Sequence, residues 1–401
     1  MRQNAAMAPS SSATAIAVAP PLPAHRPPLP ALTSLRFLTA LHVFLFHLEA
    51  ARIVFAPQWL RSLSSIGYVG VSWFFVLSGF ILTYAHAGRA QSLHAFWWAR
   101  AVRVVPAYWV AALVAAPVFF YVLTRVPPVA GADAMAGMRE HPWISTLLAF
   151  ALLQAWVPWA ALAVNPVGWS LSVEAFFYFV FPLMLPWWTR RTRVALCIAL
   201  ALLAAASLAA AGAYVQWTPD GIAHTAYDMN HLVWLNVLRF NPLVRLPEFL
   251  IGVCGALLFL QCRSPAHWGT PLVVLGMVAF AAVTISAALW PYPMLHNGLL
   301  ALPFLAIIAG VACRPDWLKV LEWRGFVALG EVSYSFFLVH AMVIAVWFRP
   351  DGATVQTSSA IEALACLAVA VCIALVLYQA VEQPARRLCA RGQTRRSAHV
   401  P

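Results

Sequence analysis

Four ionisable side chains lie inside one apolar stretch near the start of the chain. Residues 35–50 read LRFLTALHVFLFHLEA and contain Arg36, His42, His47 and Glu49. Ionisable groups at bilayer depth cost about 3 kcal/mol or more each, so a chain retains them there for a reason. On a helix, Arg36 and His47 lie about 20° apart around the axis and about 16 Å apart along it, whereas His42 lies about 140° from His47. An isolated histidine of this kind is usually satisfied by its neighbours, but two aligned groups favour a function, with His47 as general base and Arg36 as a basic anchor.

A second basic pair lies in HAFWWARAVRVVPAYW, residues 94–109. Arg100 and Arg103 are one helical turn apart, and Pro106 is expected to open the next helix. An arginine at the membrane edge usually serves as a cytoplasmic anchor. A pair on the same side as Arg36 could also clamp phosphates, because a guanidinium offers a planar fork of donors.

The stretch NPVGWSLSVEAFFYFVFPLML, residues 165–185, places Ser170, Glu174 and Tyr178 on one helical face at i, i+4 and i+8. Nothing in that stretch neutralises Glu174, which therefore requires an arginine, a histidine or a proton from elsewhere. Apolar stretches contain further polar residues. Ser78 lies beside Gly79, Ser333 and His340 lie on one helical face at i and i+7, and Arg245 and Glu248 are three residues apart. We interpret Gly79 as a close-packing residue and Arg245 with Glu248 as an internal ion pair.

Composition places these residues in a membrane protein. The chain has 401 residues, of which 63% are hydrophobic and 9% charged, whereas soluble domains have about 25% charged residues. The net charge of +12 is expected from basic loops that face an anionic inner leaflet, and nucleic-acid binding is not expected. No metal site is expected, because the seven cysteines show no ligand-like spacing with one another or with histidine.

We predict an all-α, polytopic transmembrane helical bundle with about ten spans and one re-entrant or interfacial segment. The segment 143–159 is short and interrupted by Pro158, so it is expected to dip into the membrane within an outer loop, 125–165. With ten spans and both termini cytoplasmic, about 17 basic residues lie inside and about 6 outside. The expected location is a bacterial cytoplasmic membrane. The predicted spans are 31–50, 67–86, 104–124, 166–187, 194–214, 243–261, 270–290, 296–313, 326–348 and 361–380.

The predicted domains follow from these spans. Residues 1–30 are rich in Ala, Pro and Ser and are expected to be a disordered cytoplasmic tail. Residues 31–384 form the membrane domain, and residues 385–401 form a basic cytoplasmic tail.

Seven short motifs follow one another along the chain. They are Arg36-x10-His47, FFVLSGF at 74–80, the RxxR of Arg100 and Arg103 followed by Pro106, WSLSVE at 169–174 with Tyr178 and Pro182, PEFLIG at 247–252, GEVSYSFFLVH at 330–340 and VEQP at 381–384. In this order they resemble the acyltransferase 3 family of integral-membrane O-acyltransferases. The resemblance covers nearly the whole chain, with departures at Ala99, where the family often has arginine, and Val339, where it often has tryptophan.

The resemblance implies transfer of an acyl group, most often acetyl from acetyl-CoA, to a hydroxyl of a saccharide or other envelope or secreted molecule. Family members often carry a fused extracytoplasmic esterase-like domain, and we expect none in this chain. His47 would be general base or transient acyl carrier, Arg36, Arg100 and Arg103 would bind the donor, and Glu174 would orient or neutralise a cationic partner. The residues expected to support the site or the substrate are Ser78, Ser170, Ser172, Tyr178, Ser333, Tyr334 and His340.

The alternative is a transporter or flippase for a lipid-linked envelope sugar, with Arg36 and Glu174 as gating charges. Secondary transporters are commonly built from inverted repeats. No internal repeat is visible in this sequence, which argues against a transporter. A purely structural membrane partner is hard to reconcile with this many ionisable groups in apolar stretches.

Overall fold

The structure is a computed structural model, and it confirms the predicted all-helical polytopic bundle. It describes residues 26–89, 92–125, 135–221, 232–262, 265–349 and 355–389. Most of the predicted N-terminal tail (1–25) and C-terminal tail (390–401) lies outside the described residues. The described helical stretches long and apolar enough to cross a membrane number ten: Pro30–Ala50, Leu60–His86, Leu93–Arg125, Pro166–Trp188, Arg193–Trp217, Val233–Gln261, Pro265–Ile285, Tyr292–Ala312, Arg324–Phe348 and Ala360–Cys389.

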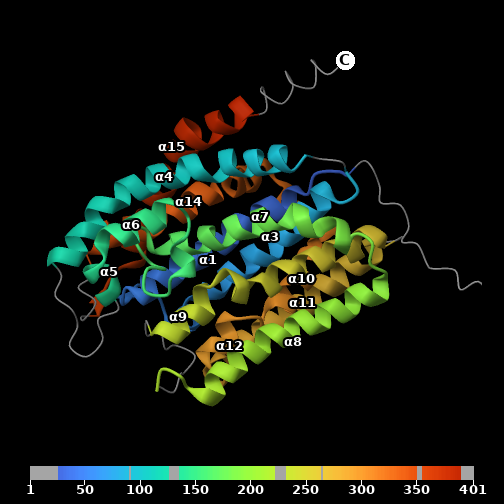
Figure 1. The fold of residues 1–401 in the computed structure, drawn as a ribbon, viewed down its shortest axis with the longest axis horizontal. Coiled ribbons are helices and arrows are strands. Elements are labelled where there is room, and N and C mark those ends of the chain that lie inside the picture. Colours follow the sequence, from blue (N-terminus) through green and yellow to red (C-terminus); the bar gives the residue numbers. More distant parts are fainter. Residues whose placement is uncertain are drawn as a thin grey trace, which may run out of the picture.

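Most helices run in the same general direction in Figure 1, with α4 and α15 along one edge, α8 along the other and α1, α3, α7, α10 and α14 between them. A short parallel pair of strands, β1 (Ile53–Val54) and β2 (Gln356–Thr357), joins distant parts of the chain. The helices are α1 (Pro30–Ala50), α2 (Gln58–Ser64), α3 (Gly70–His86), α4 (Leu93–Arg125), α5 (Ala136–Glu140), α6 (Pro142–Phe150), α7 (Trp169–Trp188), α8 (Arg193–Trp217), α9 (Val233–Phe240), α10 (Pro242–Gln261), α11 (Gly269–Ile285), α12 (Tyr292–His296), α13 (Ala301–Ala312), α14 (Arg324–Phe348) and α15 (Ala360–Leu377).

Glycines set the two closest helix crossings in the centre of the bundle. A Cβ atom added at Gly79 of α3 would lie 2.0 Å from the carbonyl oxygen of Phe249, and one at Gly252 of α10 would lie 2.0 Å from that of Val76. Gly330 of α14 approaches the carbonyl oxygen of Thr33 in α1 in the same way. Only glycine permits such backbone contact, and these crossings hold α1, α3 and α14 around a common space.

The segment predicted to dip into the membrane forms no span of its own. Helix α6 has nine residues, and residues 154–165 of the irregular chain after it are buried or half-buried in the protein. Two of its buried side chains form hydrogen bonds within the protein: Gln154 donates to the Tyr108 hydroxyl at 3.2 Å, and Asn165 donates to the carbonyl of Leu338 at 2.9 Å. Irregular backbone at membrane depth requires such burial in protein.

Helix α4 begins earlier than predicted, and the expected helix start at Pro106 is wrong. The helix starts at Leu93, and Ser92 caps it by accepting a hydrogen bond from the Ala95 amide at 3.1 Å. Pro106 lies inside the helix. Arg100 and Arg103 are therefore held by a rigid helix rather than by a loop.

The last helix continues past the predicted end of the membrane domain at residue 384. After α15, a π-helical turn at Tyr378–Glu382 leads into a helical segment that reaches Cys389. This wide turn directly precedes Pro384, whose missing N–H disturbs the regular helical ladder. Arg386, which was assigned to the basic tail, consequently lies on a helix beside the bundle.

Candidate active site

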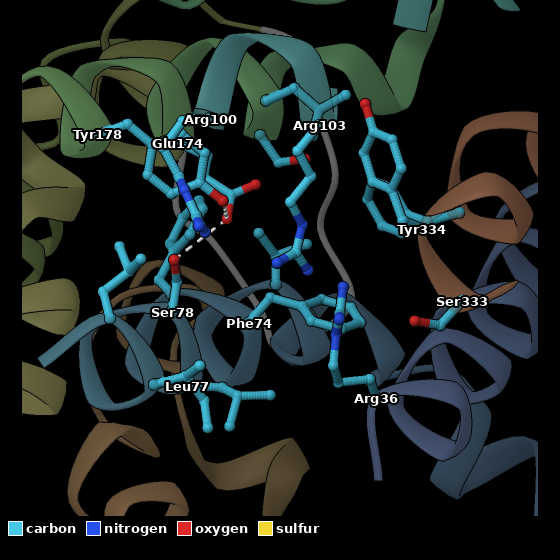
Figure 2. Close-up of a pocket in the computed structure, with 17 residues that line it drawn as sticks. Arg36, Phe74, Leu77, Ser78, Arg100, Arg103, Glu174, Tyr178, Ser333 and Tyr334 are labelled. Carbon is cyan, nitrogen blue, oxygen red and sulfur yellow. Dashed lines mark hydrogen bonds between the residues drawn. The ribbon is translucent and has the colours of Figure 1, made fainter. Parts of the chain in front are cut away.

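A cavity of about 110 Å³ brings together most of the predicted site residues (Figure 2). Because its charged residues are mainly arginines, we name it the arginine cavity. Its polar lining comes from five helices: Arg36 of α1, Ser78 of α3, Arg100 and Arg103 of α4, Ser170, Glu174 and Tyr178 of α7, and Ser333 and Tyr334 of α14. The i, i+4, i+8 spacing of α7 thus points three side chains into one space, as the sequence predicted.

Glu174 is hydrogen-bonded by neutral hydroxyls rather than paired directly with a cation. Within the described chain it accepts from Ser78 Oγ at 3.1 Å and from the Tyr178 hydroxyl. Arg36 and Arg100 lie close enough to interact with it electrostatically. Figure 2 shows Arg36 and Arg103 reaching into the cavity from opposite sides. With Arg36, Arg100 and Arg103 facing one carboxylate, the cavity has an excess of positive charge that suits a phosphate-bearing ligand.

A second cavity, of about 250 Å³, lies next to the first. We name it the histidine cavity, because His47 and His296 line it. The two cavities share two lining residues, Val71 of α3 and Phe337 of α14. Phe337 also packs with Val43 and Val167 in a small apolar cluster. The wall between the cationic space and the His47 space is therefore a few apolar side chains thick. The remaining lining of the histidine cavity is Val43, Phe46, Ala50, Tyr68, Leu162, Pro166, Val167, Trp169, Arg239 and Phe240.

His47 and His340 form a contact that fixes where their protons lie. His340 Nδ1 lies 2.8 Å from the carbonyl oxygen of Phe337, so this nitrogen is the donor and His340 Nε2 is an acceptor. His47 Nδ1 lies 3.2 Å from that Nε2 and 2.8 Å from the carbonyl oxygen of Val43. Since both neighbours are acceptors, His47 Nδ1 carries the proton, and its Nε2 retains a lone pair. This tautomer is the one that a general base at His47 requires.

A family model for an acyltransferase domain matches residues 29–379. The chain belongs to the acyltransferase 3 family. The matched range includes every predicted site residue. The protein is therefore an integral-membrane O-acyltransferase, which uses an acyl donor and a hydroxyl acceptor, and the predicted enzyme class is confirmed over the transporter alternative.

Named relatives agree with this assignment. The chain is 31% identical to "Acyltransferase MdmB" of Streptomyces mycarofaciens over 93% of its own length and 95% of the relative. It is 28% identical to "Exopolysaccharide production protein ExoZ" of Rhizobium meliloti, covering 83% and 92%. It is 24% identical to "O-acetyltransferase OatA" of Staphylococcus aureus, covering 79% of this chain and 50% of that protein. No solved structure matches the chain.

Three other polar residues of the acyltransferase line neither cavity. His42 Nε2 donates to the carbonyl oxygen of Leu63 at 2.9 Å, and Glu49 pairs with Arg61 at 3.2 Å. Ser172 donates to the carbonyl oxygen of Leu152 at 2.6 Å, and so holds the buried segment after α6 rather than a cavity. Within the described ranges, no group of three His, Cys, Asp or Glu side chains is placed to hold a metal ion.

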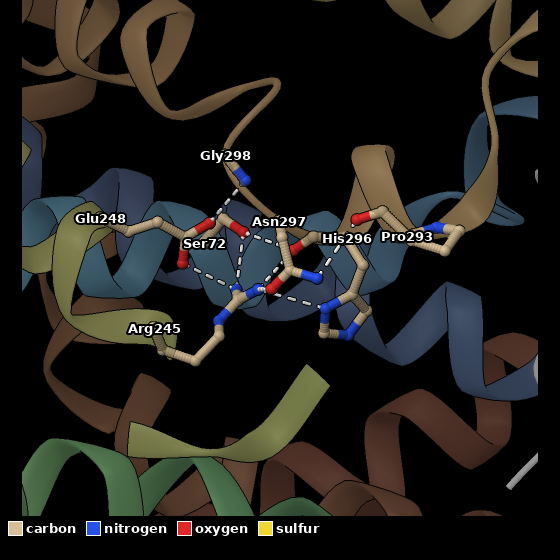
Figure 3. A network of polar contacts seen from close by, with 7 residues as sticks. All are labelled: Ser72, Arg245, Glu248, Pro293, His296, Asn297 and Gly298. Carbon is tan, nitrogen blue, oxygen red and sulfur yellow. Dashed lines mark hydrogen bonds and ion pairs between the residues drawn. The ribbon is translucent and has the colours of Figure 1, made fainter. Parts of the chain in front are cut away.

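The predicted ion pair of Arg245 and Glu248 is present and fully buried (Figure 3). The two side chains lie 2.8 Å apart and are each 1% exposed. Ser72 accepts from Arg245 at 2.9 Å, and the amide of Gly298 donates to Glu248 at 3.1 Å. This network reaches His296 at the edge of the histidine cavity.

Three residues at or beside the two cavities were not predicted from the sequence. Arg239 and His296 line the histidine cavity. Arg386 interacts electrostatically with Arg36 and Arg100 at the arginine cavity. Arg239 in LRFNP and His296 in LHNGLL each lie at the edge of an apolar stretch of the sequence. Such a position is also that of an ordinary interfacial residue, and the two cases can be separated only when it is known which helices meet.

Proposed function

We propose that the acyltransferase moves an acyl group, most simply acetyl from acetyl-CoA, to a hydroxyl of a saccharide or another envelope or secreted molecule. One observation carries this proposal. A cavity with excess positive charge shares a wall, Val71 and Phe337, with a cavity that contains a histidine whose free lone pair is fixed by its neighbours.

The arginine cavity suits the donor. Coenzyme A carries several phosphate charges, and Arg36, Arg100 and Arg103 provide forked donors for them. The cavity is apolar at the shared wall, where Phe74 packs against Phe337. A donor with its phosphates among the arginines would direct its thioester toward this wall and His47.

His47 would act as the general base. Its Nε2 takes the proton of the acceptor hydroxyl while the hydroxyl oxygen attacks the thioester carbonyl carbon. The new C–O bond forms, the C–S bond breaks, and the proton passes from His47 to the departing thiolate. In the intermediate stage, the protonated His47 is stabilised because its Nδ1–H already donates toward His340 Nε2 at 3.2 Å. His340 therefore acts as a positioning residue.

The histidine cavity suits a hydroxylated ring as acceptor. Tyr68, Trp169 and Phe240 supply aromatic faces, which pack against the apolar faces of sugar rings, and Arg239 adds a charged donor. The name of the relative ExoZ refers to exopolysaccharide production, which supports a saccharide acceptor.

We propose further that the arginine cavity opens toward the cytoplasm of a bacterial inner membrane, with both termini on that side. The bias of about 17 basic residues inside against about 6 outside supports this orientation. A reporter fused after Arg193 should give a cytoplasmic signal, and an outside signal would refute the orientation.

The function is tested by mass spectrometry of envelope glycans and secreted metabolites from a strain that lacks the gene. We expect one molecule to lose the mass of one acyl group and to regain it when the wild-type gene is restored. Restoration by a His47→Ala variant at equal membrane abundance, or the absence of any lost acyl mass, would contradict the proposal.

A further inference from the structure

We infer that Arg386 binds the 3′-phosphate on the nucleotide of the acyl-CoA donor, and that the enzyme thereby distinguishes CoA from donors that lack this phosphate. The inference rests on the proposed function and adds a recognition site outside the arginine cavity. Arg386 lies beyond the π-helical turn after α15, in the helical segment that reaches Cys389.

A buried ion pair fixes the position of Arg386. Its Nη2 donates to Oε1 of Glu382, whose side chain is fully buried. Ser335 of α14 donates to Oε2 of the same carboxylate at 2.6 Å. Because both carboxylate oxygens are held, one side of the Arg386 guanidinium is anchored to the bundle.

The π-helical turn packs directly against the helix that carries two of the cavity arginines. Its Val381 shares an apolar cluster with Val104 of α4 and Tyr334 of α14. The Tyr334 hydroxyl donates to the carbonyl oxygen of Val104 at 2.8 Å, next to Arg103. The segment after the turn is therefore held beside the arginine cavity.

Four guanidinium groups consequently lie in one electrostatic neighbourhood. Arg386 interacts with Arg103, and also with Arg36 and Arg100. Arginines do not lose their protons in proteins, so these like charges repel one another. An anion that bridges them relieves this repulsion, and phosphate is the anion whose geometry matches a guanidinium.

Part of the Arg386 guanidinium remains open to such an anion. Glu382 occupies Nη2, and the exposed Glu331 accepts a hydrogen bond from the Tyr378 hydroxyl at 3.2 Å. Within the described chain, Nη1 of Arg386 forms no hydrogen bond, and the side chain is 32% exposed. A ligand at the surface of the bundle can therefore reach it.

The donor must extend past the arginine cavity. CoA carries its thiol at one end, a diphosphate in the middle and a 3′-phosphate on the nucleotide at the other end, and it exceeds a cavity of about 110 Å³. With the thiol end at Phe337 and the diphosphate among the cavity arginines, the nucleotide lies outward. Arg386 lies about 6 Å beyond the buried Glu382 along the helix, and so presents a cation on that outward side.

The test compares two ligands and two neighbouring arginines. Purified wild type, Arg386→Gln and Arg387→Gln are titrated calorimetrically with CoA and with dephospho-CoA, which lacks only the 3′-phosphate. Arg387 provides the matched control, because it is the next residue, carries the same charge and is exposed.

We expect the wild type to bind CoA at least about tenfold more tightly than dephospho-CoA, a difference of about 1.4 kcal/mol. Arg386→Gln should bring the two affinities within about twofold of each other and leave that for dephospho-CoA unchanged, because the substitution removes one charge-assisted contact. Arg387→Gln should keep the wild-type ratio.

Equal wild-type affinities for the two ligands, or a ratio that Arg386→Gln leaves unchanged, would overturn the inference. Equal weakening of both ligands in Arg386→Gln belongs to the second case, because it indicates that the ion pair with Glu382 is structural. The wild-type ratio requires no substitution, so it tests the inference even if Arg386→Gln does not fold. If the wild type binds neither ligand, it is the proposed donor that has failed.

Discussion

The arginine cavity and the histidine cavity share a wall but differ in how their polar atoms are held. In the arginine cavity, long side chains reach in from separate helices, and Glu174 is held by hydroxyls rather than by a direct ion pair. In the histidine cavity, each ring nitrogen that faces a neighbour is constrained by a backbone carbonyl, a second histidine or a buried guanidinium.

This difference separates recognition by charge from recognition by individual atoms. Charge acts over distance and tolerates small shifts of a long side chain, whereas proton transfer requires one lone pair in one direction. Substitutions in the histidine cavity should therefore cost more activity than substitutions in the arginine cavity, and both should cost more than changes outside them.

The largest effect is expected at His47. His47→Ala removes the base and should lower esterification by about 10² to 10⁴, because the acceptor hydroxyl then loses its positioned proton acceptor. The measurement is ester content of the cellular product at matched membrane abundance. His42→Ala is the control, since His42 lies on the same helix and donates to the carbonyl of Leu63 instead. Greater loss in His42→Ala than in His47→Ala would show that the wrong histidine has been assigned.

A smaller effect is expected in the arginine cavity. The double change Arg100→Lys and Arg103→Lys keeps both charges but removes the forked donors, and should weaken acyl-CoA binding by about tenfold. Calorimetric titration of the purified protein with CoA measures it. The double change Arg190→Lys and Arg191→Lys is the matched control, because this pair follows α7 and lines neither cavity. Unchanged affinity in the first variant would assign its arginines to membrane anchoring alone.

The shared wall should affect selectivity more than rate. Phe337→Ala widens the contact between the cavities and should raise the use of hexanoyl-CoA relative to acetyl-CoA by about fourfold to fifteenfold, the effect of one to two buried methylene groups. Competition between the two donors in membranes measures this ratio. Phe119→Ala removes a buried ring that lines neither cavity and should leave the ratio unchanged. An unaltered ratio in Phe337→Ala would show that the donor does not meet this wall.

The smallest effect is expected at Glu49, outside both cavities. Its ion pair with Arg61 is partly exposed, and pairs of this kind contribute about 1 kcal/mol or less. Glu49→Gln should therefore change thermal stability slightly and leave esterification within about twofold of wild type. A loss as large as that of His47→Ala would remove the distinction between cavity residues and their surroundings.

The arginine cavity could be predicted largely from sequence because its residues lie in recognisable patterns on single helices. Arg100 and Arg103 lie one turn apart on α4, and Glu174 and Tyr178 share a face of α7. Such spacing does not depend on knowing the fold. The ten spans were predictable for a similar reason, since length and hydropathy determine them.

The histidine cavity was less accessible because its polar groups come from chain segments far apart. His296 contacts Arg245, which lies 51 residues away in the chain. Arg245 in turn contacts Ser72 of α3, and α3 crosses α10 at Gly79 and Gly252. The start of α4 was missed for a local reason: Pro106 was interpreted as a helix start, although Ser92 provides the cap.

The central claim is that the donor lies in the arginine cavity with its thiol end at the wall shared with the histidine cavity. It is tested most directly by an experimental structure of the purified protein with bound CoA. We predict density for the phosphates beside Arg36, Arg100 and Arg103, and density for the thiol end beside Phe337, on the side that leads to His47. CoA bound at another surface, or with its thiol end directed away from Phe337, would contradict the account.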